Sequence, residues 1–555
     1  MRCLFAAEQK ATGCTKRLWL TGMGVALVCS LVSSLPVHAQ TPSVRRAQTA
    51  QTPPPEQGTA MPASTTERVL ELSLEDAIRL ALQNNLDIER DRFNPLIAHS
   101  DVEQARAAFD PAIGLETSIS QTKSLPTTEI VVGTDSAGNP VFVPRRPFSK
   151  DGEVTPLFKQ QIITGGNYEL RFVNTRQNIS PTILTTGTRT LQDPRFESSL
   201  ELTFIQPLLR DFGIAVNTAP IRRAQKAEEI AEERLLQTIL DVVFRVQEVY
   251  WGLVFRIGDL AARRESQKLA EDFLAENKVR VELGTLAPIE LVQAETQVKI
   301  REEDVIVAEA AVRDAEDTLQ EVLNIPEMLG TWALRVRPID KPAFTPVSAL
   351  TVEEQVVQAL KSRPDILESR LDIASRQIAR DVARNQLLPR LDFEAQGALR
   401  AFGAGADDAL GTLSDAEGYL WFLGLRFEYP LGNRAARNEF SKRSLELQQA
   451  LVEQRRIILT IVREIRQAVR DIETSIKRVE VTRAATVLAQ TQLDAEQERF
   501  RLGLSTSFRV LEFQTDLTDA RSAETRALSD YNVDLAQLDQ RTGTLRYVPL
   551  PPETK

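Results

Sequence analysis

The segment RIILTIVREIRQAVRDIETSIKRVEV, residues 456–481, decides the fold of this chain. Its apolar residues recur in alternating steps of three and four: Ile458, Val462, Ile465, Val469, Ile472, Ile476 and Val479. On a helix this spacing gathers the apolar side chains into one stripe, which is typical of coiled-coil packing. No proline lies between Gly432 and Leu502, so we expect one helix over this whole stretch. With about 71 residues at 1.5 Å per residue it would span about 105 Å, which no single globular core accommodates.

A second segment with the same spacing and the same length lies between Gly213 and Leu283, and its only proline, Pro220, is near the start. Its stripe consists of Leu235, Ile239, Val242, Val246, Val249 and Leu253. The two segments align without a gap, since Gly213 falls on Gly432 and Gly284 on Gly503 at a single offset. After each long helix, at Gly284 and Gly503, we expect the chain to return as a helix of about 40 residues.

The two segments are also alike before the long helices, where a larger offset places Pro111 on Pro389. The change of offset means that the first copy carries an insertion between Pro111 and Gly213 that the second copy lacks. A helix over residues 87–110 and the returning helix together roughly match one long helix in length. We therefore predict two internal repeats, in each of which two shorter helices line up beside one long helix.

The ends of the chain differ in composition from these repeats. A basic start, an apolar run and a small-residue exit before Gln40 predict a secretory signal peptide cleaved after Ala39. Residues 40–66 are rich in Pro, Thr and Gln, which is typical of a flexible leader. The predicted domains are the signal peptide 1–39, the leader 40–66, the first repeat 70–325, an inter-repeat segment 326–350, the second repeat 351–546 and the tail 547–555.

Cleavage of the signal removes most of the residues that metal sites and catalytic centres use. All three cysteines, Cys3, Cys14 and Cys29, lie inside it, and His99 is the only histidine that remains. We therefore expect no metal, no cofactor and no catalytic residues, and only an enzyme that works with carboxylates alone would be left. Cleavage also changes the net charge from −10 to −13, which repels phosphate backbones and makes nucleic acid an unexpected partner.

Beyond Pro111 and Pro389 the apolar period changes from 3.6 to 2, which indicates strands. We expect two amphipathic strands per copy, near 115–120, 196–204, 391–396 and 419–429. The last of these has aromatic residues at both ends, as strands at a membrane interface often do. A separate hairpin is expected within the additional residues of the first copy, from Leu157–Ile163 and Tyr168–Val173. No uncharged apolar run long enough for a transmembrane helix follows the signal.

Four strands per chain leave two open edges, and a sheet that faces lipid cannot leave its edge amides unpaired. A membrane barrel needs at least eight strands. We therefore expect three chains to form one barrel of twelve strands, four from each chain, with their helices continuing as a long tube.

The paired copies resemble the TolC-like outer-membrane efflux proteins over about residues 70–546. The resemblance rests on the helix that ends at Pro111 or Pro389, the strand pair, the long helix and the Leu-Gly-Thr or Leu-Gly-Leu-Ser turn that follows it. It implies an α+β membrane protein in the cell outer membrane, a homotrimeric β-barrel that continues into an α-helical coiled-coil tunnel in the periplasm. It further implies a passive duct, not an enzyme, that receives substrate from an inner-membrane pump through a periplasmic adaptor. By the same resemblance, residues 326–350 and the tail form an equatorial band around the tunnel.

The periplasmic mouth of the tunnel is one candidate site. In the family, acidic residues narrow this mouth, and the corresponding places hold Arg509 and Glu512. This chain therefore departs from an all-acidic ring, and a mixed ring in which Arg509 pairs with Glu512 or with Glu290 could close the mouth instead. The alternative is that all three are solvated helix charges, because exposed pairs contribute only about 0–1 kcal/mol.

The two turns that follow the long helices are the other candidate site. They consist of Leu283, Gly284 and Thr285 in the first copy and of Leu502, Gly503, Leu504 and Ser505 in the second. Glycine at a reversal permits a left-handed backbone and the close approach of another chain. The resemblance implies that the adaptor docks on these tips. The alternative is that each glycine serves its turn alone.

Two other classes of protein remain open from sequence. A secreted or surface coiled-coil scaffold or adhesin explains the apolar stripes but leaves the strands without a role. A glycoside hydrolase with two carboxylates would need a compact fold around a cleft, which the long helices do not provide. The transported substrate and the class of pump cannot be read from the sequence.

Overall fold

The computed structural model describes residues 68–123, 125, 128–145, 148–179, 195–325, 334–346, 350–415 and 418–544, all within one compact unit, Thr65–Lys555. The predicted signal peptide, the leader and the tail 547–555 lie outside the described residues, as do 326–333 and 347–349 of the inter-repeat segment.

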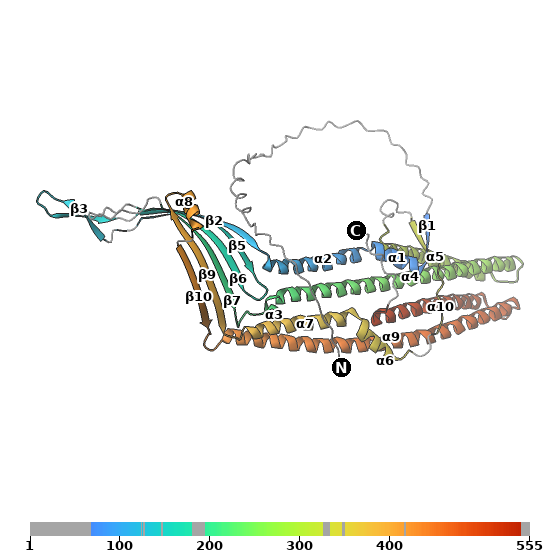
Figure 1. Cartoon of the computed structure of the whole chain (residues 1–555). Helices are drawn as coiled ribbons and strands as arrows, with labels where there is room; N and C mark the ends of the chain where they lie inside the picture. The colour runs from blue at the N-terminus through green and yellow to red at the C-terminus, as the bar shows by residue number, and fades with distance from the viewer. Residues whose placement is uncertain are drawn as a thin grey trace, which may run out of the picture. The chain divides into compact units, whose positions relative to one another are not determined.

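Two very long helices dominate the unit, as predicted (Figure 1). They are α4 (Ala219–Glu282, 64 residues) and α9 (Arg434–Arg501, 68 residues), both somewhat shorter than the sequence predicts. Helix α4 is shorter because a proline is tolerated only in the first turn of a helix, so α4 begins next to Pro220. A separate short helix, α3 (Ile214–Asn217), precedes it. Each long helix is followed by one of 36 residues, α5 (Pro288–Leu323) or α10 (Ser507–Thr542).

Shorter helices complete the layer beside each long helix. They are α1 (Leu74–Asn84), α2 (Leu86–Arg106) with the short 3-10 helix η1 (Ala107–Phe109), α6 (Val352–Ser362) and α7 (Pro364–Asn385). Both α2 and α5 pack along α4, and both α7 and α10 pack along α9, which confirms the predicted side-by-side arrangement (Figure 1). The two halves are joined because α10 and α7 also pack against α4.

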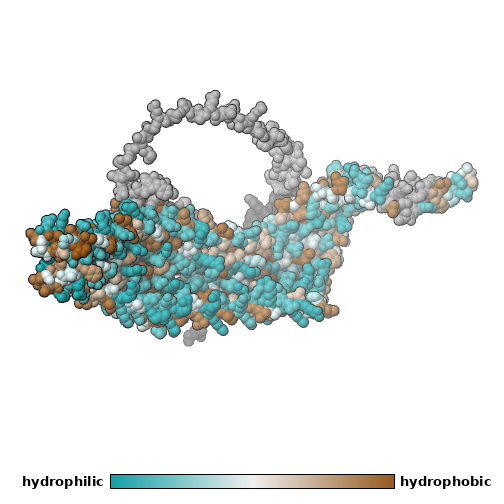
Figure 2. Space-filling model, turned by 180° about the vertical axis from the view of Figure 1, so that it is seen from behind, coloured by the Kyte–Doolittle hydropathy of each residue, from teal (hydrophilic) through white to brown (hydrophobic). Residues whose placement is uncertain are grey.

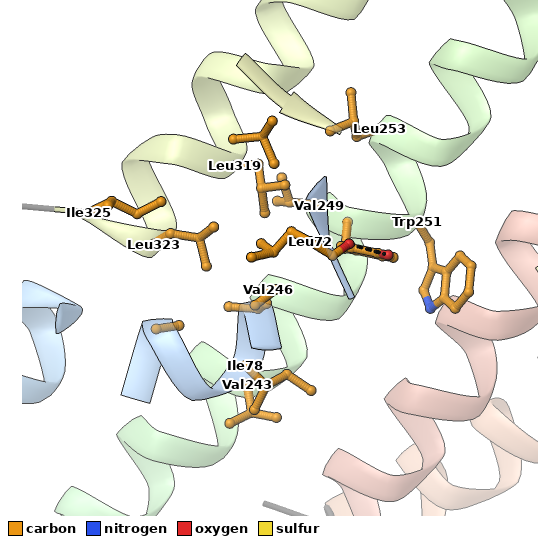
Figure 3. Close-up of a cluster of buried hydrophobic side chains, with 14 of the residues drawn as sticks. Leu72, Ile78, Val243, Val246, Val249, Trp251, Leu253, Leu319, Leu323 and Ile325 are labelled. Atoms are coloured by element: carbon orange, nitrogen blue, oxygen red, sulfur yellow. Dashed lines mark hydrogen bonds between the residues drawn. The ribbon is translucent and has the colours of Figure 1, made fainter. Parts of the chain in front are cut away.

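The apolar stripe of α4 forms the centre of one core cluster (Figure 3). Val246 and Leu253 of α4 are fully buried against Leu319 of α5, because residues three and four apart share one helix face. The Tyr250 hydroxyl donates a hydrogen bond to the backbone carbonyl of Leu72 (3.0 Å), which fixes the start of the described chain on α4. Trp251 of α4 is buried in the same cluster.

A strand pair that the sequence did not predict lies next to this cluster. Strand β1 (Arg68–Leu72) pairs in parallel with β8 (Leu334–Pro338), which belongs to the segment between the two predicted repeats. The predicted leader therefore ends just before a strand, and the described part of the inter-repeat segment is held against α4 and α5.

The main sheet has six strands in the order β10-β9-β7-β6-β5-β2. Their bounds are β2 (Ala112–Lys123), β5 (Phe148–Gln161), β6 (Asn167–Ile179), β7 (Arg195–Pro207), β9 (Arg390–Gly403) and β10 (Gly418–Glu428). In the part of the chain that the structure describes, the expectation of four strands per chain was therefore wrong, and the twelve-stranded trimer derived from it loses its basis. The predicted hairpin became β5 and β6 and lies between β2 and β7, because its alternating strands fit the same sheet and satisfy their backbone groups there.

The register separates the side chains of this sheet onto two chemically different faces. One face carries the odd-numbered residues of β2, β9 and β10 and the even-numbered residues of β5, β6 and β7. We call it the apolar face, because its central rows are almost entirely aliphatic and aromatic and it bears no Asp or Glu. The opposite, polar face bears every acidic residue of the six strands: Glu116, Asp151, Glu153, Glu169, Glu197, Glu201, Asp392, Glu394 and Glu428.

Three smaller elements were not predicted. Strands β3 (Thr128–Thr134) and β4 (Pro140–Arg145) form a separate hairpin, and helix α8 (Ala406–Leu413) connects β9 with β10. None of the described helices has an apolar stretch of the length and hydropathy that a membrane crossing requires.

Candidate functional site: the tips of the helical hairpins

The two predicted tips have the same backbone geometry. Gly284 (φ 72°) and Gly503 (φ 74°) both adopt the left-handed conformation directly after a long helix. The amide of Thr285 donates to the carbonyl of Arg280 (2.9 Å), and the amide of Leu504 donates to that of Arg499 (2.8 Å). This pattern is a Schellman motif, in which a glycine ends the helix and the following amide satisfies a free carbonyl. Glycine is therefore needed for the turn itself at both tips.

Both tips expose apolar side chains that the fold does not use. Leu283 and Leu502 are each 73% exposed, Leu504 is 67% exposed, and Phe508 at the start of α10 is exposed as well. Figure 2 shows apolar residues gathered at this end of the helices. An exposed apolar cluster on an otherwise polar helical surface is typical of an interaction site.

Side chains stabilise the second tip more extensively than the first. The Ser505 hydroxyl donates to a carboxylate oxygen of Glu496 (2.5 Å), and Arg499 forms an ion pair with the same carboxylate (3.3 Å). Because Glu496 is buried, this network attaches the turn to the last part of α9. At the first tip, the Thr285 hydroxyl donates only to the carbonyl of Arg280 (3.0 Å).

The three predicted gate residues lie near these turns but do not contact one another. Arg509 and Glu512 lie on the first turns of α10 and are exposed. Glu290 lies in the first turn of α5 and is partly buried, with one carboxylate oxygen, Oε2, that has no hydrogen-bond partner. No ion pair among the described residues joins these three side chains, so one chain alone does not form the predicted mixed pairs.

A compact apolar cluster beneath the second tip ties the ends of α4 and α9 to the start of α10. Phe273 and Phe500 lie with their ring centroids 5.2 Å apart, and the guanidinium of Arg280 lies 4.8 Å from the Phe500 centroid. Buried around them are Leu493, Val510, Leu511 and Leu517. The exposed tip residues are therefore presented by a packed support.

Buried polar residues that the sequence reading missed continue this support along α4, α5 and α10. The Asn277 amide donates to the Ser507 hydroxyl (3.2 Å), and Arg301 donates to the Thr515 hydroxyl. Arg301 also forms an ion pair with Asp304 (3.6 Å). A signal for Asn277 existed, because it continues the spacing of three and four set by the buried residues Ala270 and Phe273.

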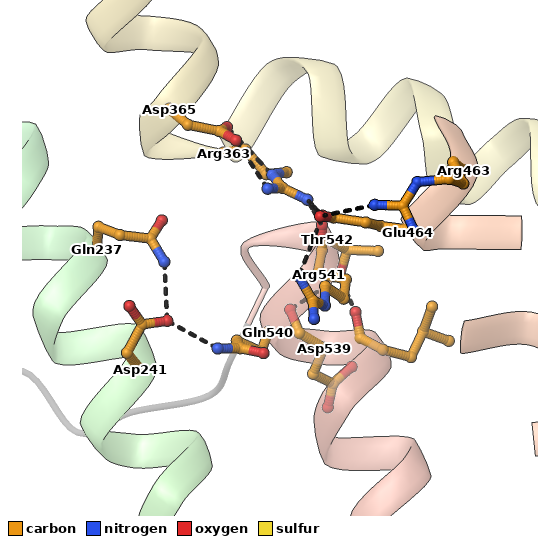
Figure 4. Close-up of polar contacts among 11 residues, drawn as sticks. Gln237, Asp241, Arg363, Asp365, Arg463, Glu464, Asp539, Gln540, Arg541 and Thr542 are labelled. Carbon is orange, nitrogen blue, oxygen red and sulfur yellow. Dashed lines mark hydrogen bonds and ion pairs between the residues drawn. The ribbon is translucent and has the colours of Figure 1, made fainter. Parts of the chain in front are cut away.

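At the other end of α10, a cluster of charged side chains joins three helices (Figure 4). Arg363, just before α7, forms ion pairs with Asp365 (2.7 Å) and with Glu464 of α9 (2.8 Å). Arg541 of α10 binds the same Glu464 (3.1 Å). Burial disfavours the charge of Arg363, but its bonds to the two carboxylates prevail and raise its pKa above the ordinary value.

Two observations concern the residue types that metal sites use. No group of three or more His, Cys, Asp or Glu side chains is placed there to hold a metal ion. His99 lies on the exposed surface of α2, where its Nδ1 is 2.8 Å from a carboxylate oxygen of Glu228.

Comparison with known proteins shows which proteins this chain resembles in sequence and in fold. Residues 356–544 match the sequence profile of the outer membrane efflux protein family. The chain is 22% identical over 375 residues to the outer membrane protein TolC of Vibrio cholerae, an alignment that covers 64% of this chain and 80% of that protein. It is 26% identical over 272 residues to the pyoverdine export outer membrane protein OpmQ of Pseudomonas aeruginosa, covering 47% of this chain and 54% of that protein.

A solved structure shares the fold at low sequence identity. The crystal structure of the outer membrane protein VceC of Vibrio cholerae superposes with a TM-score of 0.58 at 17% identity. The superposition covers 85% of this chain and 96% of that one, so the fold similarity includes both the sheet and the helical layers.

Proposed function

Because the resemblance of this chain to the TolC-like outer-membrane efflux proteins is confirmed, we propose that it is the outer-membrane channel of an efflux or secretion assembly. In this proposal the chain resides in the cell outer membrane, with its helices forming a tunnel in the periplasm. It acts as a passive duct without a catalytic step, and it receives substrate from an inner-membrane pump through a periplasmic adaptor.

The two-faced sheet is the observation that carries this proposal. Side chains on its apolar face are widely exposed in a single chain, including Ile113, Tyr419, Trp421 and Leu423. The polar face carries all the carboxylates of the strands. The strands of a membrane β-barrel need an apolar face toward the lipid and a polar face toward the water-filled interior, and this sheet has both. A scaffold or adhesin has no need for this separation.

Closure of the sheet requires other copies of the chain. Strands β2 and β10 are its two edges, and their unpaired backbone groups cannot face lipid. Three copies in which each β10 pairs with the β2 of its neighbour would close the sheet with eighteen strands, six from each chain. Barrel diameter grows with strand number, so we expect a wider pore than a twelve-stranded barrel has.

The helices also leave apolar side chains that fit contacts between copies. Ile306 and Val307 on α5 and Val481 and Leu488 on α9 are all well exposed in the single chain. Since a helix exposed to water on that side would carry polar residues, we propose that neighbouring copies cover these positions in a homotrimer.

The exposed tips complete the proposed assembly. We place adaptor docking at Leu283, Gly284 and Thr285 and at Leu502, Gly503, Leu504 and Ser505, which lie at one end of the helical layers. Arg509, Glu512 and Glu290 would meet their counterparts only in the trimer, where a ring of alternating charge could narrow the mouth. The relative named for pyoverdine export aligns over about half of its length, and no cargo is carried over from it.

Cross-linking of the sheet edges tests this proposal. The mature chain that we predict has no cysteine, so pairs can be introduced cleanly: Thr117→Cys on β2 combined in turn with a cysteine at position 419, 421 or 423 of β10. We expect one pair to give covalent trimers on oxidation in outer-membrane fractions. The control is Phe172→Cys on the interior strand β6, which should not cross-link. A chain that stays monomeric, or that does not fractionate with the outer membrane, would contradict the proposal.

A further inference from the structure

A groove lies on the apolar face of the sheet, at the end of the strands that carries α8. It encloses about 650 Å³ and is lined by residues of β2, β5, β6 and β7 and by Ala406 of α8. Ile119, Val154 and Phe196 contribute apolar side chains from three different strands. Glu153 and Glu197 also border the groove, but the register turns their side chains toward the polar face. The groove is therefore open to the surroundings of the apolar face and separate from the hairpin tips.

Helix α8 packs against β9 and β7 at this end of the sheet (Figure 1), and its Ala406 borders the groove. It approaches closely because Gly403 has no side chain: a Cβ there would lie 2.4 Å from the backbone nitrogen of Ala409. Ala401 and Ala409 are buried in this contact. The groove thus has a floor formed by the sheet and a rim formed by a helix.

The cations of the apolar face are concentrated at this end. Among the described residues of this face, the charged ones are Lys123, Lys150 and Arg176, which are diagonal neighbours on β2, β5 and β6. Arg176 lines the groove and lies 5.8 Å from the centroid of the Phe196 ring. Within the described residues, Arg176 has no carboxylate partner, since all acidic residues of the strands lie on the polar face.

Two neutral polar side chains that line the groove, Asn174 and Ser198, are hydrogen-bonded to each other and to the backbone. The Ser198 hydroxyl donates to the side-chain oxygen of Asn174 (2.9 Å), and the Asn174 amide donates to backbone carbonyls of Phe172 and Val154. The Asp408 carboxylate of α8 accepts from the amide of Ala404 (3.0 Å). Arg176 is the cationic side chain among the residues that line the groove, and a guanidinium suits phosphate.

We propose that this groove binds an anionic, acyl-chain lipid of the surrounding membrane, with a hydrocarbon chain along Ile119, Val154 and Phe196 and the phosphate at Arg176. This inference rests on the proposed function, because only a membrane-embedded sheet presents the groove to lipid. Charge complementarity selects the occupant, since apolar walls ending in three cations fit a chain that ends in an anion. Each chain carries one such site.

Lipid retention by the purified trimer tests the proposal. Native mass spectrometry would follow palmitoyl-oleoyl phosphatidylglycerol against phosphatidylcholine with the same chains, and inorganic phosphate as a competitor. We expect one phosphatidylglycerol per chain to be retained in preference to phosphatidylcholine, with no competition by phosphate alone. Arg176→Glu should weaken retention roughly tenfold, the effect of losing one charge-assisted contact.

Matched variants separate the groove from the general surface. Gly152 lines the groove, and a Cβ built on it has no other atom within 4 Å, so a side chain can start there and Gly152→Trp should fill the groove and abolish retention. The control is Gly397→Trp, equally open on the apolar face of β9 but outside the groove. Arg195→Glu is the charge control, because Arg195 lies on the polar face over Phe402.

Equal retention in Arg176→Glu and Arg195→Glu, or in the two tryptophan variants, would overturn the lipid site. Preference for phosphatidylcholine would overturn it as well. The same spectra report the mass of the assembly, so an intact trimer without bound lipid would refute this inference and leave the proposed channel standing. A monomer would instead refute the channel.

Discussion

The joint between α1, α2 and α5 and the joint between α6, α7 and α10 occupy equivalent places in the two halves, yet different chemistry holds them. In the first, the Asn85 amide donates to the carbonyl of Val322 (2.9 Å), and the Asn324 amide donates to the carbonyl of Asn84 (2.8 Å). Two uncharged side chains thus satisfy carbonyls at the ends of helices α1 and α5 directly.

In the second joint, the residues at the same offsets are Arg363 and Gly543. Gly543 takes the left-handed conformation (φ 70°) and leaves room for the backbone of Ser362, whose hydroxyl donates to the carbonyl of Thr542 (2.6 Å). Glu464 then has two close arginine partners, Arg363 and Arg541. The difference teaches that one geometry can be stabilised by short-range amide bonds or by charge, and that only the second half should respond strongly to a change of charge.

We expect the largest effect, a loss of export, from substitutions at the tips. Variants of each tip show whether both halves take part in docking. Replacing Leu504 with Asp and Ser505 with Arg, with Gly503 retained, should abolish export, because charge would replace the exposed apolar surface of the second tip. Leu283→Asp tests the first tip in the same way. Export assays with outer-membrane fractionation measure both, and Phe142→Asp in the distant β3–β4 hairpin is the control. Normal export from an assembled double variant would place docking elsewhere.

The joints themselves should differ in stability. Glu464→Gln takes the carboxylate from Arg541 and leaves Arg363 with Asp365 alone, and we expect the free energy of unfolding to fall by about 2–3 kcal/mol. Asn85→Ala removes an N-cap and a carbonyl bond and should cost about 1–2 kcal/mol. Denaturant unfolding of the detergent-solubilised protein compares them. A smaller loss for Glu464→Gln than for Asn85→Ala would contradict the charge-based account of the second joint.

We expect a smaller effect, on single-channel conductance, from substitutions in the proposed gate. Arg509 stands at the place in the second half that Glu290 holds in the first, so the two halves would present opposite charges at the proposed mouth. Glu512→Lys should bring like charges together in the trimer and raise single-channel conductance a few-fold, since partly excluded solvent strengthens such contacts. Lys299→Glu, an exposed charge change farther along α5, is the control. Unchanged conductance in an intact trimer would show that these residues are ordinary solvated charges and do not form a gate.

The smallest effect concerns Asp534 of α10, at whose place the first half has Ala315. Burial is the main cause that raises the pKa of Asp534 above its ordinary value of 3.8, and Asp471 and Asp530 add to it against the opposing effects of Ser475 and Arg478. The folded state therefore favours the protonated acid, and the group costs stability as pH rises through its folded pKa.

Asp534→Asn should consequently raise the unfolding midpoint slightly at neutral pH, and the gain should disappear below about pH 3.8, where the acid is protonated in both states. Thermal unfolding at a series of pH values measures this difference. Glu480→Gln, which neutralises an exposed carboxylate of α9 that does not act on Asp534, is the control and should not stabilise the protein. A gain that persists at low pH would show that packing, not charge, is responsible.

Much of the helical layer could be predicted because periodicity is a local property. The steps of three and four along Ile458 to Val479 determine which face of α9 is buried, and Gly284 and Gly503 mark the turns because only a residue without a side chain readily takes their left-handed backbone. The exposed apolar residues of the tips were likewise visible in sequence. The support beneath them was not, because Asn277 and Arg301 look like ordinary polar helix residues until the partner helix is known.

The number of strands in the sheet could not be predicted from local sequence patterns. The alternation in Leu157–Ile163 and Tyr168–Val173 was enough to predict a hairpin, but not whether it stands apart or joins the sheet, since hydrogen-bond partners are chosen across the fold. By itself the sequence determined the long paired helices, their glycine turns and the two-faced character of the strands, because these follow from the spacing of side chains along one segment. Only the tertiary structure decided the six-stranded order, the charged joint at Arg363 and the groove at Arg176, because each brings together segments that lie far apart in the chain.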